Sequence, residues 1–233
     1  MPTFEEIYAR HAAEYEALVA REDYQNNLLR AIQGVIDLNG IDVIELGAGT
    51  GRVTRLLAPF VRSIRAFDAS AHMLKIGDTV MKATGTTNWT LQVADNKALP
   101  VEAASADLLI EGWSFGHATV WHVERWRDEI GAALDEMRRA ARPGGALVVI
   151  ETLGTGALEP APPSQALADF YAYLENEHGF IRHAVRTDYR FDSLEEAVTL
   201  SRFFFGDEMA DRVQRENWQI LPEWTGVWSL RLP

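Results

Sequence analysis

Apolar side chains in the first 40 residues recur every three or four positions, which is the period of an amphipathic helix. One such stripe covers residues 7–19 and a second covers residues 28–36. Asp23 precedes the second stripe and is a candidate N-cap, because its carboxylate can accept hydrogen bonds from backbone N–H groups of a first helical turn. The pattern predicts two helices, the second of which ends by Gly40.

The chain then changes to short apolar runs that alternate with helical stretches. These runs are apolar on both faces, as is typical of strands buried in a parallel sheet. The predicted strands are 42–46, 63–67, 89–93, 106–110 and 146–152, and the predicted helices are 52–60, 70–83 and 123–141. The alternation predicts an α/β fold, a doubly wound, Rossmann-like sheet with helices on both faces.

Beyond residue 152 the composition changes. A loop rich in Gly, Pro and Ala is followed by predicted helices at 165–178, 194–205 and 207–216 and predicted strands at 183–191 and 224–232. Ser193 is expected to cap the helix that starts at Leu194, with Glu196 completing a capping box. We expect a single domain over 1–233, with a helical lid in 1–40, a cofactor-binding core in 41–152 and substrate-side helices with the last two strands in 153–233.

Composition narrows the classes of partner. The net charge of −12 repels phosphate backbones, so nucleic acid is not an expected partner. The chain has no cysteine, which excludes disulfides, a thiolate nucleophile and cysteine-ligated metal and fits a cytoplasmic protein. No apolar run approaches the roughly 18 residues of a membrane span, so no membrane association is expected.

Three glycines follow the first predicted strand and lead into a predicted helix. Glu45 stands two residues before the first of Gly47, Gly49 and Gly51. Glycine permits a tight turn and close approach to a ligand, and the helix N-terminus offers free N–H groups. A dinucleotide site needs its last glycine one position later, where Arg52 stands. A carboxylate before the turn would repel pyrophosphate and attract a cationic amine.

This pattern resembles motif I of the class I S-adenosylmethionine-dependent methyltransferases, and the resemblance covers residues 43–152. Residues 64–70 are similar to the family's second strand with its ribose-binding acid, 93–100 to the segment after its third strand, and 142–149 to the turn into its fifth. The resemblance implies a seven-stranded sheet with an antiparallel last strand, in which residues 183–191 and 224–232 are strands six and seven.

The resemblance also implies a site for S-adenosylmethionine. Asp68 would accept hydrogen bonds from the ribose hydroxyls, Met73 would lie against the adenine, and Asp95 would accept from the adenine amino group. The implied cofactor-binding residues are Tyr15, Glu45, Gly47, Ala48, Gly49, Gly51, Asp68, Ala69, Met73, Asp95, Asn96, Glu111 and Gly112. For Tyr15 a place in the core is an equal alternative, with Tyr24 as a rival. Arg52 is expected on the surface of its helix.

The loop 113–122 follows the fourth predicted strand, where the family places the reacting substrate. Nucleic-acid and protein amide methyltransferases of this class carry Asn/Asp-Pro-Pro-Tyr/Phe there, whereas this chain has Glu-Gly-Trp-Ser at 111–114. His117 is the candidate catalytic base, since imidazole titrates near neutrality; a loop histidine bonded to backbone is the alternative. The candidate substrate-binding residues are Trp113, His117, Trp121 and Tyr171, for which packing in the core is the competing interpretation.

The sequence therefore predicts methyl transfer from S-adenosylmethionine to an N, O or C atom of a small molecule by direct in-line displacement, without a metal. Two alternatives remain: a nicotinamide-dependent oxidoreductase, disfavoured by Arg52 in the place of a glycine, and a non-catalytic protein that binds S-adenosylmethionine. Either a monomer or a homodimer is compatible with this interpretation.

Overall fold

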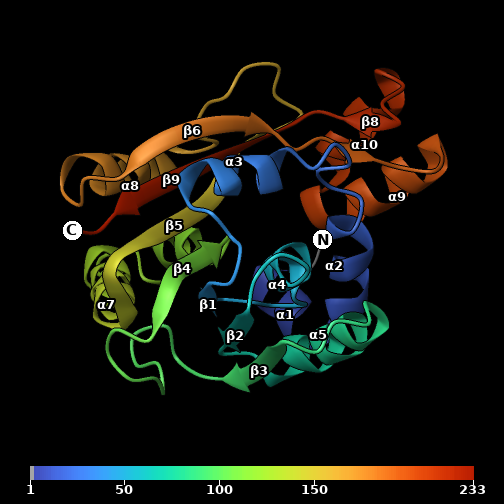
Figure 1. Ribbon diagram of the computed structural model, residues 1–233. Helices are drawn as coiled ribbons and strands as arrows, with labels where there is room; N and C mark the ends of the chain where they lie inside the picture. Colours follow the sequence, from blue (N-terminus) through green and yellow to red (C-terminus); the bar gives the residue numbers. More distant parts are fainter. Residues whose placement is uncertain (1–2) are drawn as a thin grey trace.

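A seven-stranded sheet forms the centre of the computed structural model, which describes residues 3–233 (Figure 1). The strand order is β3-β2-β1-β4-β5-β9-β6. The strands are β1 (Asp42–Leu46), β2 (Ser63–Asp68), β3 (Trp89–Val93), β4 (Ala106–Gly112), β5 (Ala141–Thr155), β6 (Ile181–Arg186) and β9 (Glu223–Arg231). The first five are parallel, and β9 is antiparallel to both β5 and β6. The predicted seven-stranded sheet with its antiparallel last strand is confirmed.

Alternate residues of the buried strands pack into two different helical layers. Ile44 and Leu109 belong to a core with α7 (Trp126–Ala140) and α8 (Gln165–Asn176). Val43 and Leu108 belong to the opposite core, with α3 (Asn27–Val35), α4 (Arg52–Leu57) and α5 (Ala71–Ala83). Since side chains alternate along a strand, runs that are apolar at every position produce a sheet covered on both faces.

The N-terminal helices differ from the prediction. The stripe over 7–19 forms two helices, α1 (Phe4–Arg10) and α2 (Ala12–Val19), because His11 between them has non-helical dihedrals (φ −124°, ψ 34°). The N-cap position of α3 is Asn26, yet the Asp23 carboxylate accepts hydrogen bonds from the N–H groups of Asn27 and Leu28 at 2.8 and 2.9 Å. Asp23 therefore does the capping chemistry expected of it from a position further upstream.

Several element boundaries also moved. The fifth strand, predicted at 146–152, is longer: β5 begins at Ala141 and ends at Thr155. The strand predicted over 183–191 is divided into β6 and β7 (Tyr189–Arg190), and β7 pairs with β8 (Ile220–Leu221) in a small second sheet. Residues 115–121 form a 3-10 turn, η1 (Phe115–His117), and α6 (Ala118–Trp121), neither of which was predicted, and α7 starts at Trp126.

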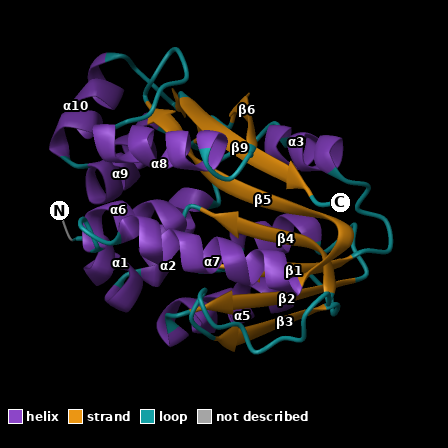
Figure 2. Ribbon diagram, turned by 90° about the vertical axis from the view of Figure 1, so that its left-hand side faces the viewer, coloured by secondary structure: helices purple, strands orange, loops and turns teal. Residues whose placement is uncertain are grey.

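The predicted helices at the C-terminal end are α9 (Leu194–Phe205) and α10 (Asp207–Arg215). Ser193 caps α9 by accepting from the Glu196 N–H at 3.1 Å, but the Glu196 carboxylate accepts from the N–H of Asp192, one residue outside the expected capping box. The last turn of α9 contacts the N-terminal helices: the Phe203 ring lies 5.6 Å from that of His11. In Figure 2 the arrowheads of β2, β3 and β4 point toward the side where α1, α6 and α9 gather.

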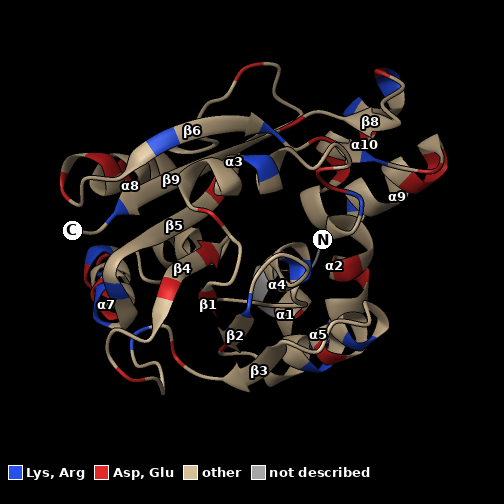
Figure 3. Cartoon of the chain, viewed as in Figure 1, with Lys and Arg blue, Asp and Glu red and all other residues tan. Residues whose placement is uncertain are grey.

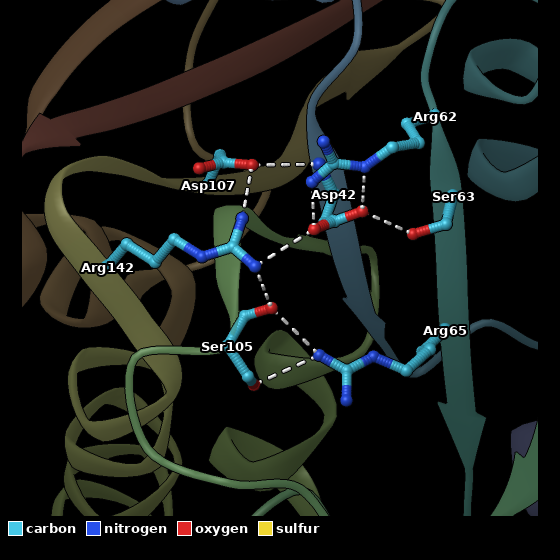
Figure 4. A network of polar contacts seen from close by, with 7 residues as sticks. All are labelled: Asp42, Arg62, Ser63, Arg65, Ser105, Asp107 and Arg142. Atoms are coloured by element: carbon cyan, nitrogen blue, oxygen red, sulfur yellow. Dashed lines mark hydrogen bonds and ion pairs between the residues drawn. The ribbon is translucent and has the colours of Figure 1, made fainter.

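A polar network ties together the opposite, amino ends of the strands (Figure 4). Asp42 at the start of β1 accepts from Arg142 of β5 at 2.9 Å and from Nε of Arg62 at 2.8 Å, and its N–H donates to Asp107 of β4 at 2.8 Å. Arg142 also donates to Asp107 at 2.7 Å. These charge-assisted bonds fix the strand starts relative to one another.

Charge elsewhere is distributed along surface helices. Acidic and basic residues are interspersed on α7 (Figure 3), which carries Asp128 and Glu129 in its first turn and Arg138 and Arg139 in its last. This arrangement complements the helix dipole. Among residues 3–233, no helix combines the length and the apolar character that crossing a bilayer would require.

Candidate functional site

A cavity of about 400 Å³ opens at the carboxyl ends of β1, β2 and β4, beneath α1 and α2. Ligands of open α/β sheets bind at this edge. The lining residues are Tyr8, Ala9, Tyr15, Gly47, Gly49, Asp68, Ala69, Ser70, Met73, Asn96, Gly112, Trp113, Ser114, His117 and Trp121. The volume suits a small organic ligand.

The glycine turn forms the floor of this cavity. Gly47 (φ +65°) and Gly49 (φ +55°) have left-handed backbones that favour glycine. A Cβ atom at Gly47 would lie 2.2 Å from the Ser114 hydroxyl oxygen, so this turn and the loop after β4 approach too closely for any side chain. Gly51 faces Met81 in the core instead of the cavity.

Asp68 at the end of β2 joins two loops that face the cavity. Its carboxylate accepts from the Gly49 N–H at 2.8 Å and from the Ser70 N–H at 2.7 Å. Burial raises its pKa above the ordinary aspartate value, and the two N–H donors oppose that shift. Each oxygen keeps a further lone pair, so the carboxylate can accept two more hydrogen bonds from a ligand diol.

Six predicted site residues lie outside the cavity lining: Glu45, Ala48, Gly51, Asp95, Glu111 and Tyr171. The Glu45 carboxyl is 2% exposed and accepts from the Thr54 hydroxyl of α4 at 2.5 Å, and burial raises its pKa to about 8. Asp95 is exposed and accepts from the Lys97 N–H. Tyr171 lies in the core, where its hydroxyl donates to the Thr152 carbonyl at 2.7 Å.

Two buried carboxyls shape the loop after β4 from below. Glu111 accepts from the N–H groups of Ser114 and Phe115 at 2.5 and 3.0 Å, and Glu151 of β5 accepts from the Gly116 N–H at 2.7 Å. Burial raises the pKa of Glu111 to about 7, and burial together with the nearby Glu111 raises that of Glu151. The three consecutive N–H groups fix the direction in which the loop leaves the sheet.

The Arg52 side chain is only 14% exposed, contrary to the expectation that it lies on the surface. Its guanidinium carbon lies 3.4 Å from the centroid of the Trp113 ring, and it pairs with the Glu22 carboxylate at 2.6 Å. Trp113 has a left-handed backbone (φ +54°), which is rare for a bulky residue. The stacked guanidinium therefore supports a strained position at the cavity wall.

An aromatic cluster closes the other side of the cavity. The His117 ring stacks on Trp121 with centroids 4.7 Å apart, and Tyr8 of α1 places its hydroxyl 2.8 Å from His117 Nε2. Burial lowers the pKa of His117 to about 4, so the imidazole is neutral near pH 7. In the tautomer with hydrogen on Nδ1, the Tyr8 hydroxyl donates to Nε2.

The structure brings together most of the predicted residues and adds four. Tyr15 lines the cavity, whereas its rival Tyr24 lies beneath the Arg190 guanidinium elsewhere. The added residues are Tyr8, Ala9, Ser70 and Ser114. Ser70 and Ser114 are next to predicted site residues in the sequence, so the sequence pattern could have predicted them. The position of Tyr8 at the cavity depends on the break between α1 and α2 at His11. No Gly or Pro in the sequence indicates that break.

A doubly wound sheet with a glycine turn after its first strand and an acid at the end of its second defines a Rossmann-like nucleotide-binding protein. A family model described as a methyltransferase domain matches residues 43–145. Residues 43–145 are a domain of the class I S-adenosylmethionine-dependent methyltransferases, as the resemblance predicted, and S-adenosylmethionine is the cofactor of this family.

Known relatives agree with this assignment. The chain is 29% identical over 147 residues to a ubiquinone/menaquinone biosynthesis C-methyltransferase, UbiE, of Rubrivivax gelatinosus, covering 59% of this chain and 53% of the relative. It is 29% identical over 151 residues to a malonyl-[acyl-carrier protein] O-methyltransferase of Pseudescherichia vulneris, covering 65% and 53%. The chain thus spans about half the length of the curated relatives it matches.

A solved structure shows the same fold over nearly the whole chain. It is a SAM-dependent methyltransferase from Aquifex aeolicus, similar with a TM-score of 0.60 over 94% of this chain and 96% of that one. The two sequences are 13% identical, so the likeness concerns the fold alone.

Proposed function

We propose that this chain transfers the methyl group of S-adenosylmethionine to an N, O or C nucleophile of a small molecule by direct in-line displacement. The observation that carries the proposal is one cavity that combines the glycine turn, Asp68 and an aromatic wall with His117. When bound, the cofactor supplies a methyl group already activated on a positively charged sulfur. The chain then has to orient the nucleophile and exclude water.

The residues present fit that cofactor. We propose that Asp68 accepts from the ribose hydroxyls, that Met73 and Asn96 contact the adenine, and that the close turn at Gly47 and Gly49 receives the methionine portion. Gly47 and Gly49 line the cavity with backbone alone, which is the basis for the last assignment. Three residues outside the lining would act through the loops they shape: Glu45 through Thr54, Asp95 through the turn that presents Asn96, and Glu111 through Ser114.

We propose that the acceptor binds against His117, Trp113 and Trp121, with the helices of residues 1–40 as the lid. Among the described residues that line the cavity there is no Lys or Arg, which supports a small molecule over a nucleic acid. The two relatives reported above are named for methylation of carbon and of oxygen. The acceptor atom therefore follows from the loops of each chain and not from the shared core.

Calorimetric titration with S-adenosylmethionine and with NAD tests the cofactor. We expect micromolar binding of the first and none of the second, and NAD binding alone would support the oxidoreductase alternative. Isotope-labelled S-adenosylmethionine offered with a mixed pool of metabolites then tests catalysis. Tight cofactor binding with no labelled acceptor would instead indicate a non-catalytic binding protein.

A further inference from the structure

The phenol of Tyr8 forms part of the cavity wall and packs directly against His117. Its hydroxyl lies 2.8 Å from His117 Nε2, and its ring packs edge-on against His117 with centroids 5.3 Å apart. It also packs edge-on against Trp121 at 6.4 Å and Tyr15 at 5.7 Å. These are favourable geometries for an aromatic ring among aromatic neighbours. The chain thus shows that a phenol packs well beside His117 and donates a hydrogen bond to it.

The charges of the cavity wall restrict what else could bind there. Over residues 3–233 the lining set contains one carboxylate, Asp68, and no cationic side chain. A phosphorylated or carboxylated acceptor would find no counter-charge, since Arg52 is held by Glu22 behind Trp113. A planar ring with a hydroxyl group finds both a stacking surface and a hydrogen-bond acceptor.

From this arrangement we propose, on the basis of the proposed function, that the methyl acceptor is a phenol whose hydroxyl binds His117 Nε2, and that Tyr8 fills its place until the acceptor arrives. The neutral state of His117 supports the same assignment, because an uncharged imidazole accepts a phenolic hydrogen bond and does not attract an anion.

The construction of α1 allows Tyr8 to leave. This seven-residue helix has its own capping box, in which the Thr3 hydroxyl accepts from the Glu6 N–H and the Glu6 carboxylate accepts from the Thr3 N–H. It is joined to α2 by the non-helical residue His11. A short helix with its own capping can move as one unit, at the cost of exposing the buried Ile7 side chain. The Trp121 ring, 41% exposed, then offers a surface at the mouth.

The transfer step balances with these groups. The acceptor oxygen forms a bond to the methyl carbon as the carbon–sulfur bond breaks, and the electron pair of that bond stays on sulfur. The phenolic proton passes to His117 Nε2, which leaves an aryl methyl ether, a neutral thioether and an imidazolium. A weak base is sufficient, because the oxygen becomes strongly acidic as it gains the methyl group. The imidazolium releases its proton to water when α1 opens.

Binding of simple naphthalenes to the protein saturated with S-adenosylhomocysteine tests the proposal. We expect 2-naphthol to bind at least tenfold more tightly than 2-methoxynaphthalene, which lacks the hydroxyl hydrogen, and than 2-naphthoate, which is anionic. Tyr8→Phe should tighten 2-naphthol binding several-fold, since it removes the internal competitor for Nε2. Tyr24→Phe, a tyrosine away from the cavity, is the matched control and should change nothing.

Three results would overturn the proposal: equal affinity for 2-naphthol and 2-methoxynaphthalene, preference for 2-naphthoate, or weaker 2-naphthol binding by Tyr8→Phe, which would make Tyr8 a binding residue. If Tyr8→Phe does not fold, His117→Ala decides, because it must abolish the preference for the hydroxyl. Failure to bind S-adenosylhomocysteine would be a failure of the proposed function instead, and it is measured separately before any naphthalene is added.

Discussion

Arg52 lies over the Trp113 ring, with its guanidinium carbon 3.4 Å from the ring centroid, while it pairs with the buried Glu22 carboxylate at 2.6 Å. This relationship connects three distant segments and supports the left-handed backbone of Trp113. Arg52→Met would leave the Glu22 carboxylate buried without its partner. We expect the free energy of unfolding in urea to fall by about 3 kcal/mol.

Lys82→Met removes an exposed ion pair and is the control for Arg52→Met, which removes a buried one. Lys82 pairs with Asp78 at 2.6 Å on the exposed surface of α5. Its loss should change stability by less than about 0.5 kcal/mol. Similar effects of Arg52→Met and Lys82→Met would show that the buried pair has no special structural role.

Gly47→Ala should abolish cofactor binding because of close contact as well as backbone strain. Gly47 and Gly85 both have left-handed backbones (φ +65° and +76°), but a Cβ at Gly85 meets nothing within 4 Å, whereas one at Gly47 meets Ser114 at 2.2 Å. Gly85→Ala should cost about 1 kcal/mol of stability and leave S-adenosylmethionine affinity intact. Calorimetry that finds equal cofactor affinity in the two variants would contradict the tight approach at Gly47.

Asp68→Asn should weaken S-adenosylmethionine binding by about 2 kcal/mol, or roughly 30-fold. An amide nitrogen cannot accept a hydrogen bond, so one of the Gly49 and Ser70 N–H groups or a ribose hydroxyl is left without an acceptor. Isothermal titration measures the change. Asp78→Asn on the surface of α5 is the matched control, and a variant at Asp68 that binds as this control does would exclude the ribose role.

His117→Ala should lower turnover by a hundredfold or more while cofactor affinity stays the same, since proton removal by a positioned base contributes at least this much. His72→Ala, on the exposed side of α5, serves as the control for loss of an imidazole. Unchanged turnover in His117→Ala would remove the acid–base role from this residue.

Buried carboxyls should make the cofactor-free protein less stable as the pH rises. Burial raises the pKa of Glu45 to about 8 and that of Glu111 to about 7, whereas both groups titrate near 4.5 when unfolded. Between these values the folded state binds more protons at these two groups than the unfolded state does. The stability that these two groups contribute is therefore fully present below pH 4.5 and is lost progressively toward pH 8.

Glu45→Gln removes one of these titrations and keeps an oxygen for Thr54. The slope of unfolding free energy against pH, from urea titrations at pH 5.5 to 8, should become shallower by up to about 1.4 kcal/mol per pH unit. Glu159→Gln in an exposed loop should leave the slope as it is. A slope unaffected by Glu45→Gln would show that Glu45 is ionised throughout.

The parts of the site that consist of residues close together in the sequence could be predicted from the sequence. The turn at Gly47 and Gly49 and the acid Asp68 follow directly from two strand ends, so their signals lie within a few residues. Strand periodicity also places Glu45 on the face of Val43, toward α4, where Thr54 binds it. A count of alternate positions was therefore enough to indicate that Glu45 points away from the cavity.

Contacts between distant segments were not predictable from one sequence. The sequence alone predicts that Arg52 is a surface residue of its helix. The fold, however, brings Glu22, which lies 30 positions earlier, into contact with it. Tyr8 reaches His117 because α1 and α2 separate at His11, where the helical stripe shows no interruption. Such side-chain partners depend on packing of whole elements, for which local periodicity has no signal.

The network around Asp42, Arg62, Asp107 and Arg142 (Figure 4) has a consequence for how this protein can change over generations. The network holds the amino ends of the strands together, at the end of the sheet opposite the cavity. Substitutions at Tyr8 or Trp121 therefore leave these contacts of the sheet unchanged. The specificity for the methyl acceptor can then change through substitution of a few aromatic residues at the mouth of the cavity, while the sheet and the glycine turn for the cofactor are kept.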